Sequence, residues 1–182
     1  GGKMSKSLGN VYTISQLQEK GIAPLAFKLF CFTAHYRNKL NFTFEGAFGA
    51  QKALERLYDG YLKNKEQKED IPDSLIQEYK EKFTSYINDD MNMPGAMSIV
   101  WEVARNPKKS NKFAELLLDF DKVLGLDIKN SEKYLSEFKK MNETDEIPEE
   151  INKLVEERKQ AREDKDWEKS DKIRDLIISK VQ

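Results

Sequence analysis

The chain of 182 residues has 35% charged and 38% apolar residues, a formal net charge of −1 and a mean hydropathy of −0.75. These values exclude an integral membrane protein of the helical kind, because no apolar run approaches the roughly 18 residues that a spanning helix needs. They also argue against a general nucleic-acid coat protein, which would be strongly basic. The length allows one domain of ordinary size, or one and a half.

The charge is unevenly spread along the chain. Residues 1–62 carry eight Lys/Arg against four Asp/Glu, a balance of +4, whereas the remainder carries 23 against 28. We therefore expect phosphate contacts mainly in the first third of the chain.

The chain has one cysteine, Cys31, and one histidine, His35. A disulfide within the chain is excluded, and a cytoplasmic, reducing location is expected. A structural zinc site normally needs four Cys/His ligands, so no metal site is predicted. Cys31 is expected to be a small core residue and His35 a helix-terminal or core-edge residue. The start has no secretory signal and no initiator Met, and we expect a fragment of a longer chain.

The first three predicted elements are helices. Thr13 and Gln16 have capping-box spacing for a short helix that stops at Gly21. Pro24 fits the first turn of a helix over 24–36, which is apolar on most sides and is expected to be buried. Thr43 can cap a third, amphipathic helix that runs to about residue 63.

The middle of the chain continues as amphipathic helices. The charge run 63–70 predicts a loop, and a stripe of apolar residues predicts a helix from Pro72 to Ile87. After the break "NDDMNMPG", one helix reaches Ala104 and another covers 113–124, with Gly125 placed to cap its C-terminal end. Residues 131–141 form a short amphipathic stretch.

The last part is a predicted helical hairpin. An acidic linker, "NETDEIPEE", precedes helices around 151–161 and 167–177, which a tight turn at 163–166 joins. The hairpin has few apolar residues and should be weakly stable alone. No strand pattern is convincing, so the predicted fold class is all-α: a loop with short helices (1–40), an antiparallel helical bundle (41–141) and the hairpin (142–182).

The first ten residues, "GGKMSKSLGN", combine pliable glycines with two lysines and two serines, a composition that suits a mobile loop touching a polyanion. "KMSKS" matches all five letters of the second signature motif of class I aminoacyl-tRNA synthetases. The stretches "AHYRNKLNFT", "DDMNMPGAM" and "ERKQAREDKDWEKSDKIRDLI" resemble the cysteinyl-tRNA synthetase family, in that family's order. The resemblance covers almost the whole chain.

The resemblance implies a parent enzyme, a cysteine–tRNA ligase, that attaches cysteine to its tRNA through an ATP-derived cysteinyl-adenylate. It implies that Lys6 is the catalytic, ATP-binding lysine, with Lys3 a weaker candidate for both roles and Ser5 and Ser7 as donors to phosphate or backbone. The physical role fits, because a lysine delivered by a closing loop stabilises the charge that builds on the departing pyrophosphate.

The family's other signature, H-[IL]-G-[HN], and its Cys/His/Glu zinc site are absent from this sequence. We therefore expect the fragment to be inactive alone and to hold no cofactor. ATP with Mg would be a substrate of the full enzyme, and zinc would belong to the missing catalytic domain. That domain and tRNA(Cys) are the expected partners of a monomeric, membrane-free chain.

The sequence also departs from the family in two places. Met93 stands where the family often has Thr, so the helix there is expected to lose its usual hydroxyl cap. The family usually continues into a short strand-containing tail beyond the hairpin, so this chain is expected to read the anticodon only partly.

Three residues around the tip of the hairpin, Arg162, Trp167 and Asp171, are the candidate anticodon contacts. An exposed Trp can stack on an unpaired base, while Arg and Asp can read base edges. The alternative is that Trp167 packs the two helices together and the charges form a solvated face. Arg37 and Lys39 are further candidates, for contact with the inner corner of the tRNA or for support of the first loop.

Two other functions stay open at this point. One is another class I synthetase, such as the methionine enzyme, whose helical domains are similar. The other is a non-catalytic tRNA-binding module derived from a synthetase. The coding sequence upstream of Gly1 would separate an enzyme from such a module.

Overall fold

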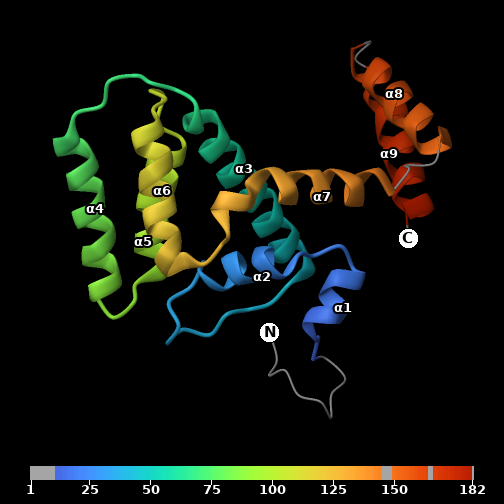
Figure 1. The fold of residues 1–182 in the computed structure, drawn as a ribbon. Coiled ribbons are helices and arrows are strands. Elements are labelled where there is room, and N and C mark those ends of the chain that lie inside the picture. The colour runs from blue at the N-terminus through green and yellow to red at the C-terminus, as the bar shows by residue number, and fades with distance from the viewer. Residues whose placement is uncertain (1–10, 145–148, 164–165, 182) are drawn as a thin grey trace. The chain divides into compact units, whose positions relative to one another are not determined.

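The computed structural model describes residues 11–144, 149–163 and 166–181, and Figure 1 shows that these residues form helices joined by loops. The α-helices are α1 (Ile14–Glu19), α2 (Pro24–Cys31), α3 (Phe44–Lys65), α4 (Asp73–Asn88), α5 (Met93–Ala104), α6 (Asn111–Leu124), α7 (Ser131–Thr144), α8 (Glu149–Glu163) and α9 (Trp167–Val181), with a 3-10 helix, η2 (Ile128–Asn130), before α7. No strand occurs in these ranges, and the all-α prediction is confirmed. The chain divides into two compact units, with the boundary between Glu137 and Phe138.

Helix α1 begins at the predicted capping box. The backbone N–H of Gln16 donates to Thr13 Oγ1 at 3.2 Å, and the Thr13 N–H donates back to Gln16 Oε1 at 2.8 Å. Gly21 then adopts a left-handed φ of +79°, which turns the chain so that the next residue, Ile22, is fully buried. The local signals of this segment therefore act as the sequence predicts.

Helix α2 is shorter than the predicted 24–36. It ends at Cys31, and the Thr33 hydroxyl donates to the carbonyl of Phe30 at 2.7 Å, in the turn that follows the helix. The helix buries Ala26, Leu29 and Phe30, so that position 31 points outward. The expectation that Cys31 packs in the core is therefore wrong, because its side chain is exposed.

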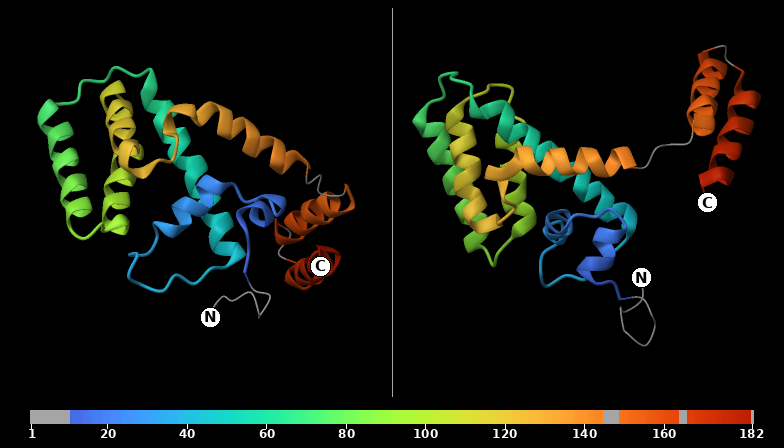
Figure 2. Two further views of the ribbon diagram at one scale, coloured as in Figure 1. Left: turned by 60° about the horizontal axis from the view of Figure 1, so that its bottom comes forward. Right: turned by 45° about the vertical axis from the view of Figure 1, so that its right-hand side comes forward.

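Helices α3, α4, α5 and α6 form a bundle in which α5 and α6 each pack against both α3 and α4, and Figure 2 shows this arrangement in two views. Phe83 of α4 stacks on Phe120 of α6, with ring centroids 4.1 Å apart. The side chains that are fully buried or nearly so come from all four helices: Leu54, Leu57, Tyr58, Phe83, Val100, Val103, Phe113, Leu117, Phe120 and Leu124.

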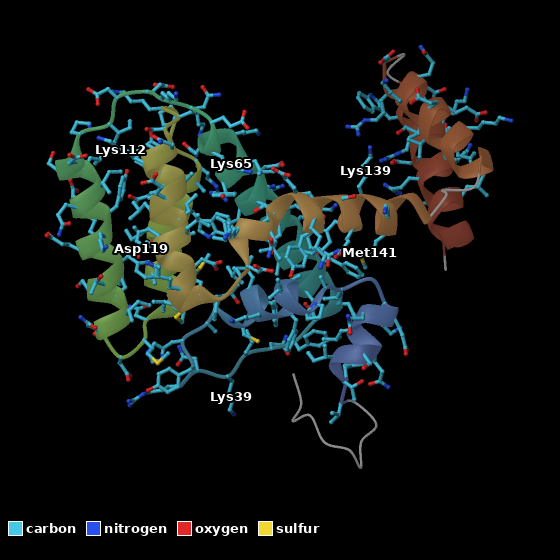
Figure 3. The ribbon with its side chains drawn as sticks, viewed as in Figure 1. Lys39, Lys65, Lys112, Asp119, Lys139 and Met141 are labelled. Carbon is cyan, nitrogen blue, oxygen red and sulfur yellow. The ribbon has the colours of Figure 1, made fainter. Side chains whose placement is uncertain are left out.

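Two ion-pair groups join α4 to α6 at the surface, and Figure 3 labels two of their α6 residues, Lys112 and Asp119. Lys112 Nζ lies 2.7 Å from a carboxylate oxygen of Asp73, and Asp119 accepts from Lys80 at 2.8 Å and from Lys122 at 2.7 Å. Hydrogen bonds from Lys122 and Lys80 lower the pKa of the Asp119 carboxyl. Exposed pairs of this kind add little stability each, so the apolar core remains the main contribution.

The start of α5 corrects one expectation. The cap residue is Asn92, one position before Met93, and its side chain accepts from the Gly95 N–H at 3.0 Å. Met93 is the first helical residue and is buried. The helix thus has a side-chain cap despite the missing Thr, because asparagine is among the strongest N-cap residues.

Polar contacts of buried or half-buried groups fix the turn after α6. Gly125 has a left-handed φ of +57°, and the Asp121 carboxylate accepts from the N–H groups of Leu126 and Ile128 at 2.7 and 2.8 Å. The buried Tyr58 hydroxyl donates to the Leu126 carbonyl at 2.6 Å. The turn is therefore tied to α3 through an interior hydrogen bond.

The second unit contains the predicted hairpin. Helices α8 and α9 pack against each other and bury Ala161, Ser170 and Ile173. The predicted turn lies partly outside the described residues, at 164–165. Among the described residues, no helix is both long and apolar enough to span a bilayer.

The close contact between α3 and α5 gives a first prediction. A Cβ on Gly60 would lie 2.9 Å from the backbone oxygen of Ala104, whereas a Cβ on Gly49 of the same helix would meet nothing within 4 Å. Gly60→Ala should lower the free energy of unfolding by about 1–3 kcal/mol. Gly49→Ala should raise it by about 0.5–1 kcal/mol, because alanine is the better helix former. Urea unfolding of both variants measures the two signs, and equal effects would contradict the close approach.

The pH dependence of stability gives a second prediction. The Tyr134 hydroxyl donates to Asp127 at 2.8 Å, and this bond together with partial burial raises the pKa of Tyr134 from 10.0 to about 12. Its contribution to stability is therefore fully present below pH 10 and is lost as the pH rises through about 12. The loss of urea stability between about pH 9 and about pH 12 should be smaller in Tyr134→Phe than in the unaltered chain. An identical loss in both would contradict the assignment.

Candidate RNA-contacting surfaces

The residues predicted to bind ATP, namely Lys3, Ser5, Lys6 and Ser7, lie outside the described residues. Their roles therefore stay predictions. What the structure describes is the segment that follows them, beginning at Val11.

That segment is held by a cluster of aromatic rings. Tyr12 contacts Phe42 and Phe44 with centroids 5.7 and 5.0 Å apart, and Phe42 also contacts Phe27 and Phe30. Beside the cluster is a cavity of about 230 Å³, lined by Tyr12, Ile14, Leu17, Phe27, Phe30, Leu40 and Phe42. Tyr12, near the start of the described residues, thus packs on an apolar base, and Lys20 Nζ lies 5.4 Å from the centroid of the Phe44 ring beside it.

Arg37 lies on the loop 32–43 between α2 and α3 and is held by the α4–α5 turn. Its Nε lies 2.8 Å from Asp90 Oδ2, and its Nη2 donates to Asp90 Oδ1 at 3.1 Å. The neighbouring Tyr36 hydroxyl donates to the same Oδ1 at 2.7 Å. The sequence predicts Arg37 as a contact but gives no sign that a carboxylate 53 residues away binds it.

His35 joins the same group. Its Nε2 donates to the Asp90 carbonyl at 3.0 Å, and its Nδ1 accepts from the Arg37 backbone N–H at 3.3 Å, a pair of bonds that fits the neutral Nε2–H tautomer. The ring is half-buried. Among the described residues, no group of three or more Cys, His, Asp or Glu side chains could hold a metal ion.

Lys39 lies on the same loop and is labelled in Figure 3. Its side chain is exposed and makes no hydrogen bond or ion pair with any residue that the structure describes. Arg37 and Lys39 thus share one loop, the first engaged by a carboxylate and the second open to solvent.

The hairpin brings its three predicted residues to one end. Arg162 lies in the last turn of α8 and is exposed, Trp167 is the first residue of α9, and Asp171 lies one turn later. The indole of Trp167 is 60% exposed, so the alternative in which it packs between the helices is wrong. Asp171 Oδ1 accepts from Arg174 at 2.9 Å, within the same helix.

One face of α8 carries a basic hollow. A cavity of about 420 Å³ is lined by Val155, Arg158, Lys159, Arg162 and Glu163. Within the described part of the chain, the buried Nε of Arg158 has no hydrogen-bond partner. The hollow combines three cationic side chains with one acidic side chain, an arrangement that suits a phosphate or a base edge. The lining residues are spaced three and four positions apart along α8, and this spacing is the sequence pattern from which the hollow could have been predicted.

Comparison with protein families matches residues 144–177 to the anticodon-binding domain of cysteinyl-tRNA ligase. The matched segment contains Arg162, Trp167 and Asp171, the three residues at the end of the hairpin.

Curated relatives match almost the whole chain. It is 34% identical over 177 residues to cysteine–tRNA ligase 1 of Burkholderia lata, with 96% of this chain and 34% of that protein covered. It is 36% identical over 185 residues to the cysteine–tRNA ligase of Idiomarina loihiensis, covering 97% and 38%, and 33% identical over 192 residues to that of Brachyspira hyodysenteriae, covering 98% and 40%. The chain thus spans little more than a third of the length of these relatives. On these matches, the chain belongs to the cysteinyl-tRNA synthetase family.

Proposed function

We propose that this chain is the tRNA-binding portion of a cysteine–tRNA ligase, which attaches cysteine to tRNA(Cys) through an ATP-derived cysteinyl-adenylate. The observation that carries the proposal is the exposed Trp167 between Arg162 and Asp171, inside the segment that matches an anticodon-binding domain. The catalytic domain of the parent protein, with its zinc site, would carry out the chemistry, and this chain would bind the tRNA.

The chemistry of the hairpin end supports anticodon contact. An exposed indole gains about 1–3 kcal/mol by stacking on an unpaired base, and an anticodon loop offers such bases. Arg162 presents exposed donors for a base edge or a phosphate. Asp171 uses Oδ1 for Arg174, and its other carboxylate oxygen remains able to accept from a base amino group.

The first ten residues are proposed to act on ATP in the parent enzyme. Lys6 would lie against the departing pyrophosphate, with Lys3, Ser5 and Ser7 as further donors and Mg carried by the nucleotide. The reason is the five-letter motif match together with the family relationship of the rest of the chain. Lys6 would then interact more strongly with the transition state, where negative charge builds on the pyrophosphate, than with the bound substrates, and this difference would accelerate the reaction.

The two other functions are weakened to different degrees. A methionine-type synthetase is less favoured, because the relatives described above are cysteine–tRNA ligases. A non-catalytic tRNA-binding module would use the same hairpin and differ only in lacking a nucleotide-binding domain. An H-I-G-H-type motif in the coding sequence upstream of Gly1 would decide for the enzyme.

The exposed indole gives a testable prediction. Trp167→Ala in the 182-residue chain should weaken binding of the tRNA(Cys) anticodon stem-loop about tenfold, because the stacking surface is lost. Trp167→Phe keeps a ring and should lose less. Fluorescence anisotropy with a labelled RNA measures the affinity, and circular dichroism checks that the helices persist. Unchanged affinity of Trp167→Ala would remove this residue from the contact surface.

The motif lysine gives a second prediction. Lys6→Ala in the full-length parent enzyme should slow cysteine-dependent ATP–pyrophosphate exchange by about a hundredfold or more, with little effect on cysteine binding. Lys129→Ala, an exposed lysine far along the chain, is the matched control and should leave exchange unchanged. Equal exchange rates in the two variants would refute the role of Lys6.

A further inference from the structure

We propose that Asp90 is a positioning residue for RNA binding: it holds the loop 32–43 so that Tyr36, Arg37 and Lys39 form a second tRNA-contacting surface. The inference rests on the proposed tRNA-binding function. It adds a residue from the α4–α5 turn that no sequence motif connects with RNA.

Side chains of three loop residues form hydrogen bonds with Asp90. Asp90 accepts from the side chains of Tyr36 and Arg37 through its carboxylate and from His35 through its carbonyl. Three consecutive loop residues are thus bound to a residue more than 50 positions away. Such a tie removes conformational freedom that the loop would otherwise lose on binding a partner.

The backbone at Asp90 has an unusual conformation. Asp90 and Met91 have φ values of +52° and +53°, so two successive residues other than glycine adopt the left-handed region. Such conformations are disfavoured and persist only where surrounding contacts fix them. Here the Met91 N–H donates to Ile87 and the Asn92 N–H donates to Tyr86. The Met91 side chain is 56% exposed, so burial of that side chain does not explain the conformation.

The residues that Asp90 holds still present exposed groups to solvent. The side chain of Arg37 is 67% exposed despite its ion pair. Its Nη2 donates to Asp90 at 3.1 Å and its Nε donates to the Tyr36 hydroxyl at 3.0 Å. Both hydrogens of Nη1 remain for a phosphate. Tyr36 is 61% exposed, and its ring lies 4.8 Å from the His35 ring and 5.5 Å from the Arg37 guanidinium carbon.

The chemistry of this surface fits an RNA partner. A guanidinium over the Tyr36 ring, on the same loop as the exposed Lys39, offers a planar face and donors together. Unstacked bases and phosphates are the groups that such surfaces bind in RNA. Residues 1–62 carry more positive than negative side chains, and this excess of positive charge also favours binding of a negatively charged partner such as RNA. An exposed ion pair stabilises a fold little, so the network matters more for the position of the loop than for stability.

The test compares two neighbouring aspartates. Asp90→Asn and Asp89→Asn each remove one negative charge from the same exposed turn, and asparagine tolerates the left-handed backbone of position 90. If only net charge mattered, both changes would strengthen RNA binding. If Asp90 positions the loop, the two variants differ. Asp90→Asn weakens binding of full-length tRNA(Cys) by about fivefold, whereas Asp89→Asn leaves the affinity unchanged or raises it.

A double-mutant cycle separates positioning from folding. Arg37→Ala should weaken binding in the unaltered chain and should add little loss in the Asp90→Asn chain, because the guanidinium is already misplaced there. Tyr36→Phe removes only the hydroxyl that donates to Asp90, and it carries the test if Asp90→Asn alters the circular dichroism spectrum. Tight tRNA binding by both Asp90→Asn and Tyr36→Phe would overturn the inference.

The isolated anticodon stem-loop distinguishes this failure from failure of the proposed function. Asp90→Asn should leave binding of that RNA unchanged, whereas Trp167→Ala should weaken it. A chain that binds neither full-length tRNA(Cys) nor the stem-loop contradicts the proposed function, and this inference with it. A chain that binds both RNAs through Trp167 alone contradicts only the role of Asp90.

Discussion

Helix α3 is the constraint on which the first unit depends, because α2, α5, α6 and η2 all pack against it. Near its C-terminal end, Gly60 lets the helix approach the Ala104 carbonyl closely. One turn later, the fully buried Asn64 side chain donates to the Gly60 carbonyl at 2.7 Å and accepts from the Ser110 N–H at 3.1 Å. A larger residue at position 60 would separate α3 from α5 and strain the adjacent Asn64 bonds, so small size here is a requirement of packing.

The same helix also determines where the loop before it can lie. Thr43 caps α3, and Phe44 in its first turn contacts Phe42 and Tyr12. The loop 32–43 is therefore fixed at its end by aromatic packing and near its start by Asp90. RNA affinity would then be divided between this loop and the hairpin, which is how a protein recognises a long, shaped nucleic acid with several modest contacts.

Local signals allowed most of the helices to be predicted from the sequence. Thr13, Pro24, Thr43 and Gly125 act as start or stop residues at the expected places, because each depends only on neighbours a few positions away. The end of α2 was predicted too late because apolar composition does not reveal where the chain turns. Cys31 was misplaced for a related reason: a residue type that is often buried can still point outward.

The candidate RNA contacts also divide into residues that the sequence predicts and residues that only the structure brings together. Arg162, Trp167 and Asp171 could be predicted because they share one hairpin, although only the structure decides that the indole is exposed. The group around Asp90 could not, because it joins residues 53 to 55 positions apart through a left-handed backbone that sequence composition does not signal.

The distribution of the two tryptophans has a practical consequence. Trp101 lies half-buried on α5 with the Arg105 guanidinium carbon 4.9 Å from its ring, whereas Trp167 stands in solvent in the second unit. Each unit therefore contains its own intrinsic fluorophore in a different environment. A soluble quencher such as acrylamide would reduce the fluorescence of the exposed Trp167 at lower concentrations than that of the half-buried Trp101. The two units can therefore be followed separately in one sample without attached dyes.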